Sequence, residues 1–110
     1  MLADFIILAK DAIDNGVKDV AAVLACAALE DGLKRLAESV DLEVEGKDLS
    51  EVINALKATS VLPGSQARVV QSFVGVRNKA MHAEWGKIDP SEVHGVIGFV
   101  QDFVSKRFAS

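Results

Sequence analysis

The chain is poor in the residues that build sheets and that cross-link small secreted domains. It contains no tyrosine, one tryptophan, two prolines and a single cysteine, Cys26, among its 110 residues. A lone cysteine excludes an intramolecular disulfide, and its place in the apolar run from Ala21 to Leu29 predicts a small buried side chain. The scarcity of aromatic residues disfavours a sheet, so almost no strand is expected. A reducing, cytoplasmic setting fits these features.

The signals of several function classes are also missing. No glycine-rich phosphate loop and no serine nucleophile motif occurs, which disfavours nucleotide kinases and hydrolases of those types. His82, Glu84 and His94 lack the spacing of a zinc motif and no cysteine pair accompanies them, so neither a metal nor a cofactor is expected. The apolar start from Met1 to Leu8 is short, contains Asp4 and lacks a basic leader. No signal peptide and no membrane association are therefore expected.

What the chain does contain favours one helical domain spanning residues 1–110. Half of the residues are apolar and a quarter are charged, a composition typical of a folded domain of this length. The net charge is −4, but the stretch from Val52 to Ala83 carries four cations and no acid, so the remainder carries −8. This separation places a positive field on one part of the chain.

Apolar spacing and helix-breaking residues divide the chain into five helical segments. They run from about Leu2 to Asp14, from about Val17 to Val40, from Leu49 to the turn at Pro63-Gly64, from about Gln66 to Ala83, and from Pro90 to about Phe108. The second segment is rich in alanine and apolar nearly all round, which predicts a central helix that its neighbours approach closely. An all-α, four- to five-helix up-and-down bundle follows.

Local signals mark the ends of these segments. Asn15-Gly16 is typical of a helix stop, because these residues adopt left-handed backbone angles readily. Asp48 followed by Glu51 resembles a capping box, and Ser65 is the expected cap of the fourth segment. The run from Asp89 to Glu92 combines an N-cap, a proline at the first helical position and an acid in the first turn.

Turning by 100° per residue sorts the fourth segment into three strips. The expected core strip is Val69, Phe73, Val76 and Ala80, the polar strip is Gln71, Gly75, Asn78 and His82, and the third strip is Val70, Val74, Arg77 and Met81. Gly75 costs about 1 kcal/mol of helix stability relative to alanine. Close approach of another backbone would offset that cost, and in so short a chain the backbone of a second copy is the expected neighbour.

Arg77 and His82 lie about 140° apart around an ideal helix, so their side chains do not stack. An arginine among apolar neighbours needs a carboxylate, phosphate or backbone acceptor. Glu30 and Glu84 are the candidate carboxylates within the chain.

The run Arg77-Asn78-Lys79-Ala80-Met81-His82 resembles the signature of the HEPN superfamily, an arginine followed after four to six residues by a histidine. The order of segments also resembles the HEPN layout: a long alanine-rich helix, a short helix, the motif helix and a final apolar helix. The resemblance covers nearly the whole chain. It implies a helical bundle that forms a homodimer, with two motif helices meeting near a two-fold axis around one cleft.

Many HEPN domains are metal-independent RNA endonucleases, some of them toxins of toxin-antitoxin pairs or defence nucleases. Carried over, the resemblance assigns Arg77 and His82 to the scissile phosphate and Asn78 to the polar position beside them. Histidine titrates near neutral pH and suits proton transfer at a ribose 2′-hydroxyl, while arginine suits a phosphate. Arg68 and Lys79 are expected to guide the RNA backbone. RNA and an antitoxin or other protein are the expected partners.

Each assignment has a structural alternative. His82 would also fit near a helix C-terminus for its favourable interaction with the helix dipole, and Arg77 would also fit a structural ion pair. Many HEPN-like domains serve as dimerisation or binding modules, since a fold does not imply an activity. The alternative function is therefore a non-catalytic, HEPN-like module that binds a protein or a nucleotide.

Overall fold

The structure, a computed structural model, describes residues 2–107 and consists of five α-helices. They are α1 (Leu2–Asp14), α2 (Lys18–Ser39), α3 (Leu49–Ala58), α4 (Gly64–Met81) and α5 (Pro90–Arg107), with one 3-10 turn, η1 (Trp85–Lys87), between α4 and α5. Residues 2–107 contain no strand, and none of their helices is both long and apolar enough to cross a membrane. The expectation of an all-α helical bundle is confirmed.

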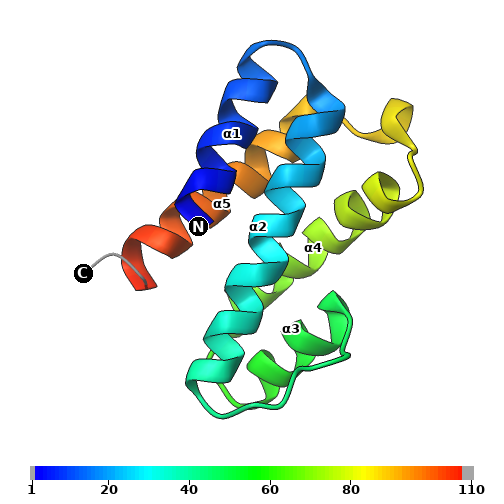
Figure 1. The fold of residues 1–110 in the computed structure, drawn as a ribbon. Coiled ribbons are helices and arrows are strands. Elements are labelled where there is room, and N and C mark those ends of the chain that lie inside the picture. Colours follow the sequence, from blue (N-terminus) through cyan, green and yellow to red (C-terminus); the bar gives the residue numbers. More distant parts are fainter. Residues whose placement is uncertain (1, 108–110) are drawn as a thin grey trace.

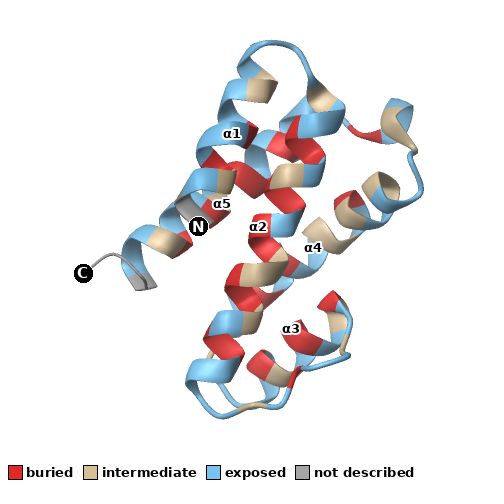
Figure 2. Ribbon diagram, viewed as in Figure 1, coloured by how far each residue is buried: buried red, intermediate tan, exposed pale blue. Residues whose placement is uncertain are grey.

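Helix α2 is the central element of the bundle. It packs against α1, α3, α4 and α5, and α1 and α4 lie beside it in Figure 1. The close packing depends on alanine, because Ala21, Ala22, Ala25 and Ala28 are all fully buried and leave room for neighbouring helices. Figure 2 shows buried residues along much of α2 and on parts of α1, α3 and α5. The alanine pattern therefore predicted the central helix correctly.

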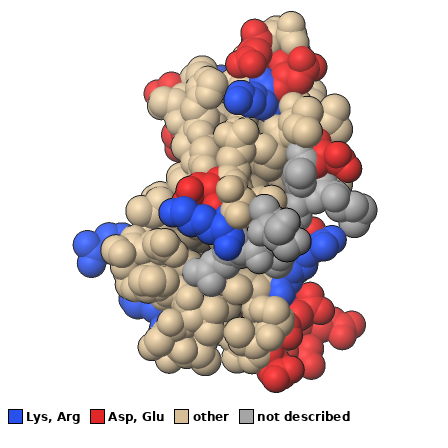
Figure 3. All heavy atoms as spheres, turned by 90° about the vertical axis from the view of Figure 1, so that its left-hand side faces the viewer, with Lys and Arg blue, Asp and Glu red and all other residues tan. Residues whose placement is uncertain are grey.

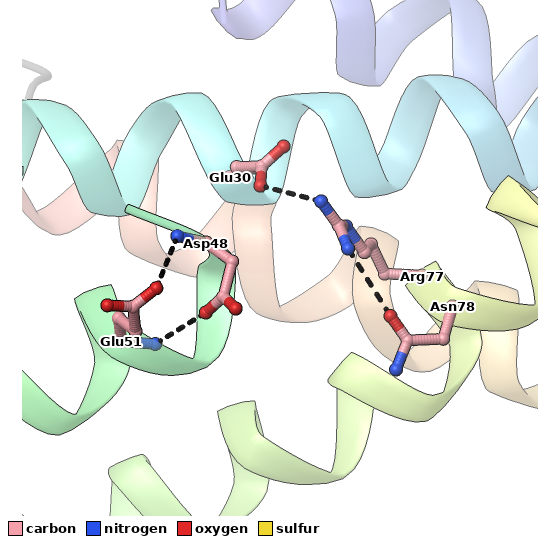
Figure 4. Close-up of polar contacts among 5 residues, drawn as sticks. All are labelled: Glu30, Asp48, Glu51, Arg77 and Asn78. Carbon is pink, nitrogen blue, oxygen red and sulfur yellow. Dashed lines mark hydrogen bonds and ion pairs between the residues drawn. The ribbon is translucent and has the colours of Figure 1, made fainter. Parts of the chain in front are cut away.

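Several helix ends follow the local signals in the sequence. Gly16 has a φ of +78° and ends α1 as expected. At the start of α3, the Asp48 carboxylate accepts a hydrogen bond from the Glu51 N–H at 2.9 Å, and the Glu51 carboxylate accepts one from the Asp48 N–H at 3.2 Å (Figure 4). This reciprocal pair is the predicted capping box. Phe108, the last residue of the expected fifth stripe, lies outside the described residues.

The boundaries of α3 and α4 differ from those predicted. Helix α3 ends at Ala58, before the turn at Pro63-Gly64, because Ser60 has a φ of +62° that a helix cannot continue through. Helix α4 begins at Gly64 with Pro63 as its N-cap, so the assignment of Ser65 as the cap is wrong. Pro63 introduces the helix because its ring holds φ near the helical value, −55° here, but it supplies no side-chain cap.

The strip of α4 that was expected to be the core is confirmed in part, because Val76 is buried and Phe73 and Ala80 are partly buried against the core. Val69 is the exception: it is 48% exposed, and Val70 from the third strip is fully buried. Val70 and Ala67 are buried instead of Val69 because α4 packs mainly against α2 and α3. The third strip, which contains Arg77, is therefore drawn toward α2.

Candidate functional site on helix α4

Arg77 extends from α4 to the facing surface of α2. Its Nη2 donates to Glu30 Oε1 at 3.3 Å, and its Nη1 donates to Asn78 Oδ1 at 3.3 Å (Figure 4). The side chain of Arg77 is 22% exposed and that of Glu30 is 27% exposed. The ion pair is therefore largely but not fully removed from water. Of the two candidate carboxylates for Arg77, Glu30 is the one used.

The guanidinium of Arg77 keeps unused hydrogen-bonding capacity. An arginine has five N–H donors and no acceptor. Within the described part of the chain, Arg77 makes the two side-chain hydrogen bonds to Glu30 and Asn78. The remaining donors are free for an anionic ligand, although Glu30 already balances the positive charge.

Glu84, the other candidate partner of Arg77, belongs to a separate ion pair. Its carboxylate accepts a hydrogen bond from Lys87 Nζ at 2.8 Å. That hydrogen bond lowers the pKa of Glu84 and raises the pKa of Lys87. The local pair across η1 therefore occupies Glu84, and Arg77 depends on a carboxylate 47 residues away in the sequence.

The Arg77–Glu30 pair lies in a hollow between α2 and α4, here called the α2–α4 hollow, with a volume of about 360 Å³. Its lining is Val23, Cys26, Ala27 and Glu30 from α2 and Arg77, Ala80 and Met81 from α4. Val23 is 48% and Met81 is 65% exposed, so apolar side chains surround one ion pair at the surface. Burial raises the pKa of the Cys26 thiol to about 11, and the nearby charge of Arg77 offsets only part of that rise.

His82 lies at the end of α4, outside the lining of this hollow. It is the C-cap residue, its backbone N–H donates to the Asn78 carbonyl at 3.1 Å, and its side chain is exposed. Within one chain, His82 is thus not among the residues that line the α2–α4 hollow with Arg77. The predicted polar strip is exposed along its whole length, and a Cβ atom on Gly75 would meet nothing within 4 Å.

The two expected backbone-guiding cations differ in their surroundings. Lys79 Nζ lies 3.6 Å from Glu92 Oε2, so a carboxylate of α5 neutralises it. Arg68 is exposed and lines a different groove between α3 and α4, together with Lys57. Lys57 belongs to the positive stretch from Val52 to Ala83 but was not predicted as a site residue, and in the folded chain it lines the same groove as Arg68.

No group of three or more histidine, cysteine, aspartate or glutamate side chains in the described chain is placed to hold a metal ion. The functional groups that α4 and its C-cap present are a guanidinium with free donors, an amide and an exposed imidazole. These groups suit the binding of an anion and the transfer of a proton.

Comparison with known proteins places the chain in a family defined by sequence. The model of a domain of unknown function, DUF4145, matches residues 8–109. Neither the curated proteins nor the solved structures contain a match. The HEPN resemblance therefore stays a prediction based on the motif and the order of helices. The chain belongs to the DUF4145 family.

Proposed function

We propose that this protein is a metal-independent RNA endonuclease of the HEPN type, active as a homodimer with a composite site. The observation that carries the proposal is the state of Arg77, whose guanidinium is held by Glu30 and Asn78 at an open hollow with donors to spare. The exposed His82 follows five residues after Arg77, as the C-cap of the same helix. Service as a toxin or a defence nuclease, with an antitoxin or other protein as partner, belongs to the same proposal.

A second copy of the chain is needed because one chain keeps the two groups apart. Arg77 faces α2, whereas His82 lies about 140° around the helix. A two-fold axis beside the C-terminal half of α4 would pair Arg77 of one copy with His82 of the other. The exposed apolar side chains of Val23 and Met81, which lie beside Arg77, support a contact between copies on this side.

The expected reaction uses the ribose of the substrate as the nucleophile. The 2′-oxygen attacks the adjacent phosphorus, and the bond from phosphorus to the 5′-oxygen breaks, giving a 2′,3′-cyclic phosphate and a 5′-hydroxyl. His82 of one copy accepts the proton of the 2′-hydroxyl, and His82 of the other donates a proton to the leaving oxygen. Arg77 binds the phosphate oxygens and stabilises the charge that develops on them. Dependence on the 2′-hydroxyl restricts the reaction to RNA.

The test is cleavage of single-stranded RNA by the purified chain in the presence of EDTA. We expect His82→Ala to lower the rate by about 10²- to 10⁴-fold, the contribution typical of a general acid or base. The matched control is His94→Ala, because His94 is the other histidine of the chain and is exposed on α5. Equal activity of the two variants would rule out His82 as the proton-transfer group.

Arg77→Lys separates a catalytic arginine from a structural one. Lysine keeps the positive charge opposite Glu30, so the ion pair and the fold should survive the exchange. It loses the planar, forked donors that bind two phosphate oxygens, so cleavage should fall strongly. Full cleavage activity in a folded Arg77→Lys variant would leave Arg77 with a structural role alone.

The second candidate is a non-catalytic interaction module, and a specific observation favours it. Arg77 already has a carboxylate partner within the chain, and the side chains around that pair are mainly apolar. Such a surface suits contact with a protein. If the pure chain dimerises but leaves RNA intact under all metal conditions, the module becomes the better description of the protein.

A further inference from the structure

Of the four cations between Val52 and Ala83, two are neutralised by the fold and two are not. Arg77 pairs with Glu30, and Lys79 pairs with Glu92, both acids from outside this stretch. Within residues 2–107, Lys57 and Arg68 make no ion pair. The unbalanced positive charge of the stretch is therefore concentrated on these two side chains.

Lys57 and Arg68 line the same surface feature, here called the α3–α4 groove, which has a volume of about 490 Å³. The remaining polar groups in its lining are neutral, among them Asn54 and Gln71, and the lining contains no acid. Gln71 Nε2 donates to Ser50 Oγ at 3.3 Å, which links α4 to α3 along the groove. Two cations and neutral hydrogen-bonding groups suit a phosphodiester backbone.

A second hollow, at the end of α2, is less favourable to a polyanion. It is larger, about 580 Å³, but Glu38, Asp41, Glu43 and Glu45 line it together with the single cation Lys34. On the face drawn in Figure 3, acidic side chains gather toward the top and the bottom of the molecule. Of these two hollows, the α3–α4 groove is therefore the one whose charge favours an anionic strand.

We propose that the α3–α4 groove is a phosphate-binding subsite for single-stranded RNA, separate from the cleavage site and occupied by nucleotides beyond the scissile bond. Arg68 and His82 share the exposed side of α4 and are separated by roughly 21 Å along the axis at 1.5 Å per residue. A strand that reaches both must run along α4 for several nucleotides. The subsite rests on the proposed function, because it takes RNA as the substrate.

The binding experiment uses the whole chain carrying His82→Ala, which prevents cleavage, and a fluorescently labelled single-stranded RNA. Adding Lys57→Ala and Arg68→Ala should weaken binding and reduce the slope of log affinity against log salt by about 1.4, because two phosphate contacts are lost. Lys10→Ala with Lys18→Ala is the control for charge, since it removes two cations from α1 and the start of α2, which lie outside the groove lining. The control should leave the slope nearly unchanged.

The cleavage experiment tests the distance between the groove and the cleavage site. In a chain with intact His82, Lys57→Ala with Arg68→Ala should raise KM for a long RNA and leave kcat nearly unchanged, because the groove binds ground state and transition state alike. For an oligonucleotide too short to reach the groove, the variant and the unaltered chain should have the same KM.

The possible results of these two experiments distinguish failure of the proposed subsite from failure of the proposed nuclease function. If the unaltered chain cleaves RNA but the groove variant binds and cleaves as the lysine control does, the subsite is wrong and the nuclease proposal stands. If the unaltered chain binds RNA through the groove without cleaving it, the subsite stands and the nuclease proposal falls. If the unaltered chain does not bind RNA, both are wrong.

Discussion

Arg77 illustrates how a single contact decides what a residue is able to do. A guanidinium that is mostly removed from water requires acceptors, and Glu30 and Asn78 supply them. The same contacts fix its orientation at the edge of the α2–α4 hollow, so a ligand would meet an arginine that has already lost much of its freedom of movement. A structural ion pair and a prepared anion site are thus compatible roles for this residue.

The reactivity of the Cys26 thiol tests how well this one side chain is buried. Because its pKa is raised to about 11, about one thiol in a thousand is ionised at pH 8 in the folded chain. We expect the native thiol to react with a disulfide reagent at pH 8 far more slowly than the thiol of the chain unfolded in denaturant. Comparable rates in the two states would show that the α2–α4 hollow admits water and reagent freely.

The raised pKa of Cys26 also links its burial to the stability of the fold. The unfolded thiol releases its proton near 9.0, whereas the folded thiol holds it until about 11. Burial of the neutral thiol therefore contributes fully below pH 9, and about 3 kcal/mol of the free energy of unfolding is lost as the pH rises through this window. Denaturant titrations from pH 8 to 11 should show this loss in the unaltered chain and not in Cys26→Ala.

At the scale of the element, α4 is a weak helix that depends on its neighbours. It begins without a side-chain cap and contains Gly75 in its middle. A Cβ atom on Gly75 would meet open space, so no close packing around this glycine offsets its cost to helix stability. The helix is held by the burial of Ala67, Val70 and Val76 against the bundle, and its exposed strip remains available for contact with another molecule.

Gly75→Ala tests whether a second copy packs on the polar strip of α4 or leaves it open. Alanine should raise the free energy of unfolding of the monomer by about 1 kcal/mol, because glycine is the poorer helix former and no atom obstructs the new methyl group. If a second backbone packs on this strip, the same methyl group should weaken the dimer. Denaturant titration at low protein concentration and light scattering across a concentration series measure the two effects.

Gly98 supplies the control for this experiment. It lies within α5, and a Cβ atom there would also meet nothing within 4 Å. Gly98→Ala should stabilise the monomer to a similar extent without changing the dimer. A monomer destabilised by Gly75→Ala would instead reveal a contact of that glycine within the chain.

At the scale of the whole molecule, the exposed apolar side chains of Val23 and Met81 in the α2–α4 hollow are the basis for the proposed dimer. We expect the chain to be a dimer at micromolar concentration and Val23→Glu to make it a monomer, because a charge cannot be buried there unpaired. Val69→Glu is a closely matched control, since Val69 has the same exposed fraction, 48%, but lies outside the hollow. Light scattering of both variants and of the unaltered chain gives the result.

Two outcomes would contradict this assembly. An unaltered chain that is monomeric at micromolar concentration would remove the basis for a shared cleft. Equal dissociation by Val23→Glu and Val69→Glu would place the interface elsewhere on the molecule. In the first case, the nuclease proposal would have to rest on a single chain, in which His82 does not line the hollow that holds Arg77. In the second case, the dimer would not form the proposed shared cleft.

Much of the architecture could be predicted from local patterns, because helix formation depends on neighbours in the sequence. The alanine-rich run predicted the central helix, and the pairs at Asp48 and Asp89 marked two helix starts that the structure contains. The predicted start of α4 was wrong, because Pro63 and the buried Leu62 determine where the helix begins, and Ser65 does not cap it.

The candidate site, too, could be predicted from the sequence only in part. The types of residue and their order, arginine, asparagine and histidine on one helix, follow from the sequence alone, as does the absence of a second cysteine. Which charges remain unbalanced depends on acids from other helices: Glu30 reaches Arg77 and Glu92 reaches Lys79, while among residues 2–107 no acid forms an ion pair with Lys57 or Arg68. Electrostatic interactions act through space and desolvation depends on what the fold covers, so only the tertiary structure could separate the neutralised cations from the available ones.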